Sequence, residues 1–203
     1  MTEQELEAKF HVAHLDAIKN NIEQLGASLI QARVHEMNLR FDTPTQELRK
    51  QESVLRLRMD DQARMTFKGP GQNEGGVISR EEIEFVVEDF DRAKKLIEAL
   101  GYQVVAFYEK YRTTYELGHT HIMLDELPYG DFVEIEGTNV AEIQEVAQTL
   151  NLRMETAIKA SYLSIFEQFA KIKNIDPTQL SFEALKNEMP NLGMLGISFA
   201  DEL

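Results

Sequence analysis

The sequence predicts an α+β fold in which a closed β-barrel with a charged lumen is covered outside by helices. Several runs alternate charged and apolar residues, and the acidic runs are separate from the basic ones. Because successive side chains of a strand point to opposite faces, each run puts its charges on one face. Whole ionic faces on about six strands favour an enclosed lumen. The alternative is an open sheet whose charged face is solvated and carries ladders of ion pairs.

Three acidic runs have the form Glu-x-Glu, with an apolar residue between the two glutamates, and Lys9 continues the first run. Carboxylates packed on one surface repel one another unless a positive group lies among them. A divalent metal ion is the natural candidate for that group. The acidic pairs are Glu5 and Glu7, Glu82 and Glu84, and Glu134 and Glu136.

The basic runs follow the same alternation, with apolar residues between or beside the charged ones. Arginine and lysine on the inner face of several strands would together bind a polyanion. The basic residues are Arg56, Arg58, Lys68, Lys110 and Arg112. The residues expected to face outward, under helices, are Leu6, Leu55, Leu57, Phe67, Tyr111 and Ile135.

The composition limits the partners of the chain. Its 203 residues suit one domain, or one domain with an appendage, and 43% hydrophobic residues suffice for a core. A net charge of −14 disfavours binding to nucleic acid or to an anionic membrane, so the arginines point to a small, enclosed anion. There is no cysteine, and neither a signal peptide nor a membrane-spanning run is evident. We therefore expect a cytoplasmic protein.

Each acidic pair begins a unit of strand, short link and helix. Apolar residues spaced by three and four predict the helices, and Gly26, Gly101 and Asn151 end them. Asp91 and Asn139 are the expected N-caps of the second and third helices.

Further strands are expected between these units, separated by glycine-, proline- and aspartate-rich turns. The glycine-rich segment 69–77 is a hairpin loop or a lid over a tunnel mouth. His119 and His121 fall in a hairpin turn, which makes a metal-binding role for them the weaker alternative. The expected strands are 28–41, 53–59, 63–68, 104–108, 110–117 and 120–125.

The strands end after Arg153. Residues 155–173 predict a helix with an aromatic stripe, and a short helical stretch follows from Asp176 to about residue 187. The tail, 189–203, carries apolar residues that are expected to pack either on the main body or on a second copy of the chain. The second alternative would make the protein a homodimer. The expected division is a domain over 1–173 and a helical extension over 174–203.

Several motifs in order resemble the CYTH family, which comprises class IV adenylate cyclases, thiamine triphosphatases and other triphosphate tunnel metalloenzymes. The similarity covers roughly residues 3–165. It is closest to the class IV adenylate cyclase branch, as in Lys68-Gly69-Pro70-Gly71. The other motifs are Glu5-x-Glu7-x-Lys9, Phe41-Asp42-Thr43-Pro44, Leu55-Arg56-Leu57-Arg58, Arg80-Glu81-Glu82-Ile83-Glu84, Glu109-Lys110-Tyr111-Arg112, Leu124-Asp125-Glu126, Gly130-Asp131-Phe132-Val133-Glu134 and Ser161-Tyr162.

The resemblance implies an eight-stranded antiparallel barrel that forms a tunnel for a triphosphate. It implies Mg²⁺ or Mn²⁺ held by Glu5, Glu7, Glu134 and Glu136. The triphosphate would be bound by Arg56, Arg58, Lys68, Lys110 and Arg112, with Lys9, Glu82, Glu84 and Asp125 as catalytic residues.

The expected reaction is conversion of ATP to cyclic AMP and pyrophosphate. One alternative is hydrolysis of tripolyphosphate, thiamine triphosphate or a nucleoside triphosphate. Another is a module that binds polyphosphate or nucleotide without catalysis. The intact acidic pairs argue against this last alternative, because binding alone needs the bases more than the acids.

Overall fold

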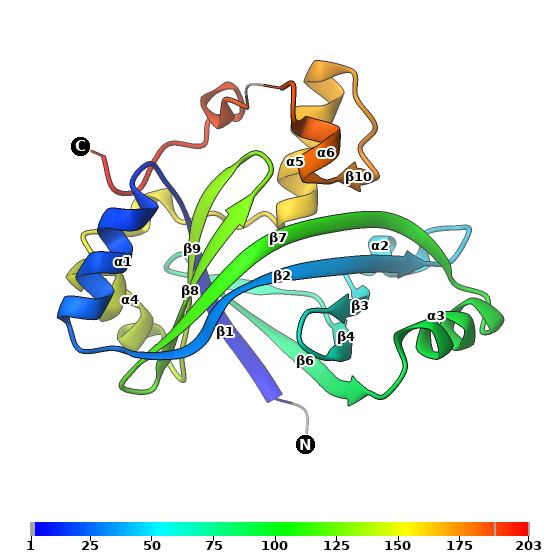
Figure 1. Ribbon diagram of the computed structural model, residues 1–203, viewed down its shortest axis with the longest axis horizontal. Coiled ribbons are helices and arrows are strands. Elements are labelled where there is room, and N and C mark those ends of the chain that lie inside the picture. Colours follow the sequence, from blue (N-terminus) through cyan, green and yellow to red (C-terminus); the bar gives the residue numbers. More distant parts are fainter. Residues whose placement is uncertain (1–2, 189, 203) are drawn as a thin grey trace.

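The structure, a computed structural model, describes residues 3–188 and 190–202. Its centre is a closed ring of eight antiparallel strands, in which the last strand pairs back with the first (Figure 1). This confirms the expected α+β architecture with helices outside the ring. In order around the ring, the strands are β1 (Glu3–Val12), β9 (Gly130–Glu136), β8 (Thr120–Leu127), β7 (Gln103–Leu117), β2 (Ser28–Asp42), β3 (Val54–Met59), β4 (Ala63–Lys68) and β6 (Val77–Val87).

The register of the ring brings charged residues of neighbouring strands opposite one another. Lys9 of β1 lies opposite Glu134 of β9, and Lys68 of β4 lies opposite Glu82 of β6. Side chains opposite one another in a sheet point to the same face, so these charges meet on the inner face of the ring.

Helices cover the apolar outer face of the ring. On one side, α1 (Leu15–Gln24) and α4 (Val140–Thr149) pack on a core that contains the fully buried Ile135. On another side, α3 (Phe90–Ala99) packs through Ile97 on Leu57, which is also fully buried (Figure 1). The outward direction predicted for Ile135 and Leu57 is therefore confirmed.

A third core lies under α5 (Tyr162–Lys173), where Phe166 and Phe169 are fully buried. The segment after α5 adds to this core through Leu180 and Leu185, and the short strand that carries Leu180 pairs parallel with β7. The remaining elements are α2 (Glu47–Lys50), β5 (Gln72–Glu74), the 3-10 helices η1 (Met154–Thr156) and η2 (Leu192–Leu195), β10 (Gln179–Leu180) and α6 (Phe182–Leu185).

Several element boundaries differ from the sequence-based expectations. The N-cap of α3 is Asp89, not Asp91, because the Asp89 carboxylate accepts the backbone N–H of Arg92. Asn139 is the N-cap of α4, as expected. The helix expected over 155–173 begins only after Ser161, whose hydroxyl caps it.

Two strands also differ from the expectations. The two strands expected over 104–117 form the single strand β7, because its pairing with the equally long β2 continues across the expected break. Within the glycine-rich segment 69–77, residues 72–74 form β5, which pairs with β6.

The described part of the C-terminal tail packs on the main body. The backbone N–H of Ala200 donates to the carbonyl of His11 at 2.8 Å, and the Asp201 carboxylate accepts the backbone N–H groups of Ala13 and His14. Phe199 stacks on the His11 ring, with 4.4 Å between ring centroids. Met1, Thr2, Met189 and Leu203 lie outside the described residues.

The contact between His11 and the tail should make stability depend on pH. Burial outweighs the opposing effect of Asp201 and lowers the pKa of His11 from 6.5 to about 4. Between these values the unfolded chain binds a proton more readily than the folded chain, so stability falls as the pH falls. We expect His11→Leu to reduce the loss of unfolding free energy between pH 7.5 and pH 5 by roughly 1–2 kcal/mol. Urea unfolding of both proteins at the two pH values measures this, and equal losses would contradict it.

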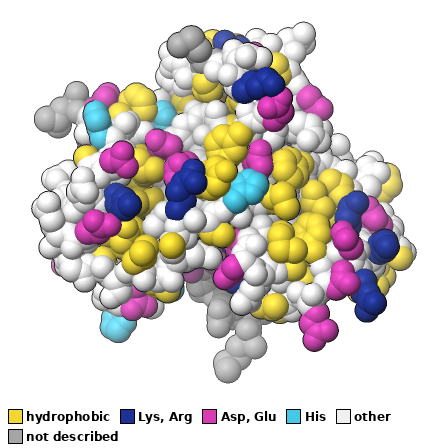
Figure 2. All heavy atoms as spheres, viewed as in Figure 1, with side chains coloured by type: hydrophobic (Ala, Val, Ile, Leu, Met, Phe, Trp, Pro, Cys, Tyr) yellow, Lys and Arg dark blue, Asp and Glu magenta, His cyan; other side chains and the backbone are white. Residues whose placement is uncertain are grey.

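The outer surface differs from the interior of the ring. Figure 2 shows hydrophobic side chains gathered over β7 and β2, where Met37 and Val104 are exposed, with charged side chains scattered around them. Among the described residues, no helix has the length and hydropathy needed to cross a membrane.

Candidate active site

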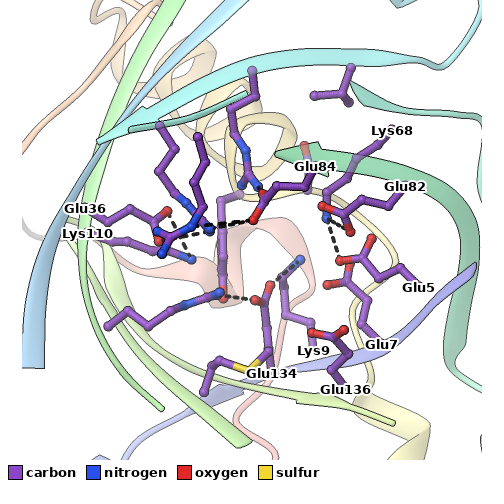
Figure 3. A pocket seen from close by; sticks show the side chains of 18 of the residues that line it. Glu5, Glu7, Lys9, Glu36, Lys68, Glu82, Glu84, Lys110, Glu134 and Glu136 are labelled. Atoms are coloured by element: carbon purple, nitrogen blue, oxygen red, sulfur yellow. Dashed lines mark hydrogen bonds and ion pairs between the residues drawn. The ribbon is translucent and has the colours of Figure 1, made fainter. Parts of the chain in front are cut away.

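The interior of the ring holds a cavity of about 480 Å³ that is lined by charged side chains (Figure 3). All eight ring strands and the start of α5 contribute to its wall. Among the described residues, nine basic and eight acidic side chains line it. They are Lys9, Arg40, Arg56, Arg58, Arg64, Lys68, Arg80, Lys110 and Arg112, and Glu5, Glu7, Glu36, Asp60, Glu82, Glu84, Glu134 and Glu136.

The structure brings together nearly all of the site residues that the sequence predicts. The four glutamates assigned to metal, the five basic residues assigned to the triphosphate, and Lys9, Glu82 and Glu84 all line this cavity. Asp125 is the exception, because it is fully buried and is not among the lining residues. The chemical roles of all these residues remain predictions.

Glu5 lies in an ion-pair network at one side of the cavity. Lys68 donates to one Glu5 oxygen at 2.5 Å, and Nε of Arg80 donates to the other at 3.0 Å. Arg80 also reaches Glu7 at 3.0 Å. Lys68 lies 3.1 Å from Glu82 (Figure 3). The two bases therefore tie strands β4 and β6 to β1.

Asp125 organises a second network behind the cavity wall. Its carboxylate accepts from Lys110 at 2.9 Å, from Nε of Arg112 at 2.6 Å and from the Tyr162 hydroxyl at 2.8 Å. Arg112 also donates to Glu134, whose other oxygen lies 3.1 Å from Lys9. Asp125 thus fixes the two cations of β7 and does not itself face the cavity.

Arg56 and Arg58 project from β3 and share Glu84 as a partner. Glu84 lies 3.4 Å from Arg56 and 3.0 Å from Arg58, and it also accepts from the Thr66 hydroxyl. The Nε atoms of both arginines are buried without a hydrogen-bond acceptor in the described part of the chain. Nε of Arg58 lies 3.4 Å from an Asp60 oxygen, beyond good hydrogen-bonding geometry.

The acidic residues divide into two electrostatic classes. Burial alone would raise the pKa of Glu5, but Lys68 and Arg80 outweigh it and hold that pKa at about 2. Likewise, Glu36 and Glu134 have strongly lowered pKa values, because nearby cations outweigh burial. In contrast, burial with repulsion from Glu5 raises the pKa of Glu82 and of Glu136 to about 7.

The four glutamates assigned to a metal have suitable chemistry, because Mg²⁺ and Mn²⁺ prefer carboxylate oxygens. Burial is the main cause of the raised pKa of Glu136, and the negative charges of Glu5 and Glu7 add to it, which favours a cation there. In the described residues, however, no three acidic or histidine side chains are grouped closely enough to hold an ion. Arg80 engages both Glu5 and Glu7 in this arrangement.

Sequence reasoning did not assign roles to several lining residues. Glu36 and Arg40 alternate with apolar residues along β2, and Arg80 shares a face with Glu82. The same alternation rule, applied to residues 34–41, would have found the first two. Asp60, Arg64 and His121 also line the cavity.

Comparison with known proteins identifies the family. The CYTH domain family matches residues 3–163. The chain belongs to the CYTH family. The match covers all eight strands of the ring and ends at the start of α5, so this CYTH protein carries the family's domain together with a further C-terminal segment.

Two relatives of this CYTH protein align with most of its sequence. A protein of Methanocaldococcus jannaschii, whose name assigns it provisionally to the adenylate cyclases, is 25% identical over 79% of this chain and 97% of its own. The adenylate cyclase CyaB of Aeromonas hydrophila is 25% identical over 81% of this chain and 89% of its own.

Solved structures share the fold of this CYTH protein. A Vibrio parahaemolyticus protein superposes with a TM-score of 0.72 at 24% identity, over 81% of this chain and 98% of that one. A Hippeastrum protein described as having a dominant triphosphatase activity superposes with a TM-score of 0.61 at 17% identity, over 81% and 96% of the two chains. At these identities the similarity shows the fold.

Proposed function

We propose that this CYTH protein is a metal-dependent enzyme that acts on a triphosphate compound, as a class IV adenylate cyclase acting on ATP. The observation that carries the proposal is the cavity of about 480 Å³ inside the ring, lined by both basic and acidic side chains. A cavity of this charge pattern suits a polyanion together with a cation. The relatives named for adenylate cyclase activity support the choice of ATP.

The basic side chains would hold the phosphate oxygens. Arg56, Arg58, Lys68, Lys110 and Arg112 all line the same cavity. Phosphoryl transfer requires mainly positioning and charge neutralisation, which fixed guanidinium groups supply. Asp125 acts as a positioning residue, because it aligns Lys110 and Arg112 through direct hydrogen bonds.

The acidic side chains would hold Mg²⁺ or Mn²⁺. Glu5, Glu7, Glu134 and Glu136 are the residues proposed for this role. A bound divalent ion lowers the pKa of a hydroxyl group and stabilises negative charge on phosphate oxygens. Lys9 lies 3.1 Å from Glu134 and would neutralise the acidic set or reach a phosphate.

In the cyclase reaction, the ribose 3′ oxygen would attack the α-phosphorus and lose its proton. A new phosphorus–oxygen bond then forms as the bond to the β-phosphate oxygen breaks, which releases pyrophosphate. The side chains of this protein would keep the attacking and leaving oxygens in line.

Hydrolysis of a triphosphate is the second candidate. Glu82 and Glu84 both line the cavity, Glu82 beside Lys68 and Glu84 beside Arg56 and Arg58, so either could orient a water molecule toward the terminal phosphorus. The Hippeastrum protein is described with triphosphatase activity on the same fold. Product analysis decides between the candidates when the protein is incubated with Mg²⁺ or Mn²⁺ and ATP, tripolyphosphate or thiamine triphosphate. Cyclic AMP with pyrophosphate supports the cyclase, orthophosphate supports the hydrolase, and no turnover would contradict both.

Arg58→Ala should weaken triphosphate binding far more than monophosphate binding. A row of phosphates engages several of the basic residues together, whereas a single phosphate cannot. The lost charge-assisted hydrogen bond should cost about 1.5–3 kcal/mol, or roughly ten- to a hundredfold in affinity. Arg58→Lys should restore only part of this, because lysine lacks the bidentate fork.

Competition of tripolyphosphate, pyrophosphate and phosphate against bound ATP measures this effect. Arg92→Ala is the control, because Arg92 lies on α3 with a side chain that is 87% exposed. If Arg58→Ala weakened all three competitors equally, or none of them, the arginine would serve only its ion pairs with Glu84 and Asp60.

A further inference from the structure

Arg40 differs from every other basic residue of the cavity wall. Each of the other eight lies within 4 Å of a carboxylate in the described part of the chain, whereas Arg40 has none at that distance. Those eight must share or release an internal carboxylate to bind an anion, and Arg40 need not.

The register of the ring places Arg40 of β2 directly opposite Arg56 of β3. Like charges opposite one another in a sheet destabilise it. The Nε atoms of both side chains are buried without an acceptor among the described residues. Burial, with repulsion from Arg56 and Arg80, also lowers the pKa of Arg40. Arg56 has Glu84 at 3.4 Å, so Arg40 is the member of this pair that no carboxylate within 4 Å compensates in the described part of the chain.

The carboxylate of Glu167 on α5 influences Arg40 but is already engaged. Arg49 donates to both of its oxygens, at 2.8 and 2.7 Å. The first turn of the same helix reaches the cavity, because Ser161, Tyr162 and Leu163 line it. The first backbone N–H groups of a helix have no partner within the helix, and the positive end of its dipole favours an anion.

We propose that Arg40, with Arg56 and the first turn of α5, forms a subsite for the terminal phosphoryl group of the substrate. This subsite rests on the proposed function and adds to the five basic residues assigned from the sequence. A terminal phosphoryl group carries more negative charge than an internal one, so it gains most from a cation that no carboxylate compensates, as Arg40 is. The planar forks of two arginines match its oxygens, as a lysine could not.

Arg40→Gln tests this subsite, with Arg33→Gln as its matched control. Arg33 lies on the same strand, but its guanidinium contacts Glu126 and Tyr111 and does not line the cavity. Calorimetric titration with inorganic tripolyphosphate in the presence of Mg²⁺ should show about ten- to a hundredfold weaker binding for Arg40→Gln and no change for Arg33→Gln.

The melting temperature of the ligand-free protein is a second readout. It should rise in Arg40→Gln if Arg40 forms the subsite, and it should fall if Arg40 has a purely structural role. Removing a repelling charge should raise the melting temperature of the ligand-free Arg40→Gln protein, while tripolyphosphate should raise it by less than in the wild type. If Arg40→Gln did not fold, Arg40→Lys should keep the ligand-free melting temperature and still bind tripolyphosphate several-fold more weakly.

The outcomes separate the subsite from the proposed function. Wild-type affinity in Arg40→Gln would overturn the subsite and leave the proposed triphosphate site intact. A lower ligand-free melting temperature would make Arg40 a structural residue and would also overturn the subsite. If the wild-type protein bound neither tripolyphosphate nor ATP, the proposed function would fail together with the subsite.

Discussion

Glu136→Gln is expected to lower turnover by about a thousandfold or more while the protein stays folded. The proposed role of Glu136 is to hold the divalent ion, whose stabilisation of phosphate charge amounts to several kcal/mol in the transition state. Product formation from ATP or tripolyphosphate, measured over a range of Mg²⁺ and Mn²⁺ concentrations, tests this. Calorimetric titration with Mn²⁺ should show weaker binding. Binding as tight as in the wild type would remove Glu136 from the metal site.

The same substitution should not destabilise the protein without metal. The pKa of Glu136 is raised to about 7, so the folded state binds a proton more readily than the unfolded state above pH 4.5. The charged carboxylate therefore lowers stability as the pH rises through 7, and glutamine relieves this by on the order of 1 kcal/mol at pH 8. Glu5→Gln should behave differently, because Glu5 compensates Lys68 and Arg80 and its loss reduces stability.

Glu81→Gln is the matched control for Glu136→Gln. Glu81 lies on β6 between two cavity-lining residues, but it is exposed and does not line the cavity. Activity and metal affinity should remain at the wild-type level. An equal loss in both variants would show that the effect reflects net charge and not a metal ligand.

Asp125→Asn is expected to lower the free energy of unfolding by about 3–5 kcal/mol. Asp125 is fully buried and compensates Lys110 and Arg112, which remain inside the protein as cations after the substitution. In the wild-type protein the Tyr162 hydroxyl donates to the Asp125 carboxylate. The asparagine amide can instead present a donor to that hydroxyl. Urea unfolding at pH 8 measures the change in stability.

Asp131→Asn is the control for that measurement. Asp131 lies on the neighbouring strand β9, and burial with repulsion from Glu126 and Asp16 raises its pKa to about 6. At pH 8 its charge lowers stability, so asparagine should leave the free energy of unfolding unchanged or increase it. A small effect of Asp125→Asn, similar to that of the control, would mean that Lys110 and Arg112 find other partners.

The alternation of charged and apolar residues determined which side chains enter the cavity. Glu5 and Glu7, Arg56 and Arg58, and Glu134 and Glu136 each share a face because the strand repeat is two residues. That rule needs no tertiary information, but it is equally compatible with an open sheet whose charged face is solvated. The sequence also predicted the helix ends at Gly26 and Gly101. Both residues adopt a positive φ, of 78° and 95°, which favours glycine after a helix.

Only the tertiary structure decided how these charges are paired. Arg80 reaches Glu5 and Glu7, and Asp125 lies behind the wall with Lys110 and Arg112, through contacts between residues 13 to 75 positions apart. Strand register and ring closure set these distances, and neither is encoded in a local pattern. For the same reason, the sequence alone did not distinguish Arg40 from the other charged residues. Its position opposite Arg56, without a carboxylate, depends on which strands become neighbours in the ring.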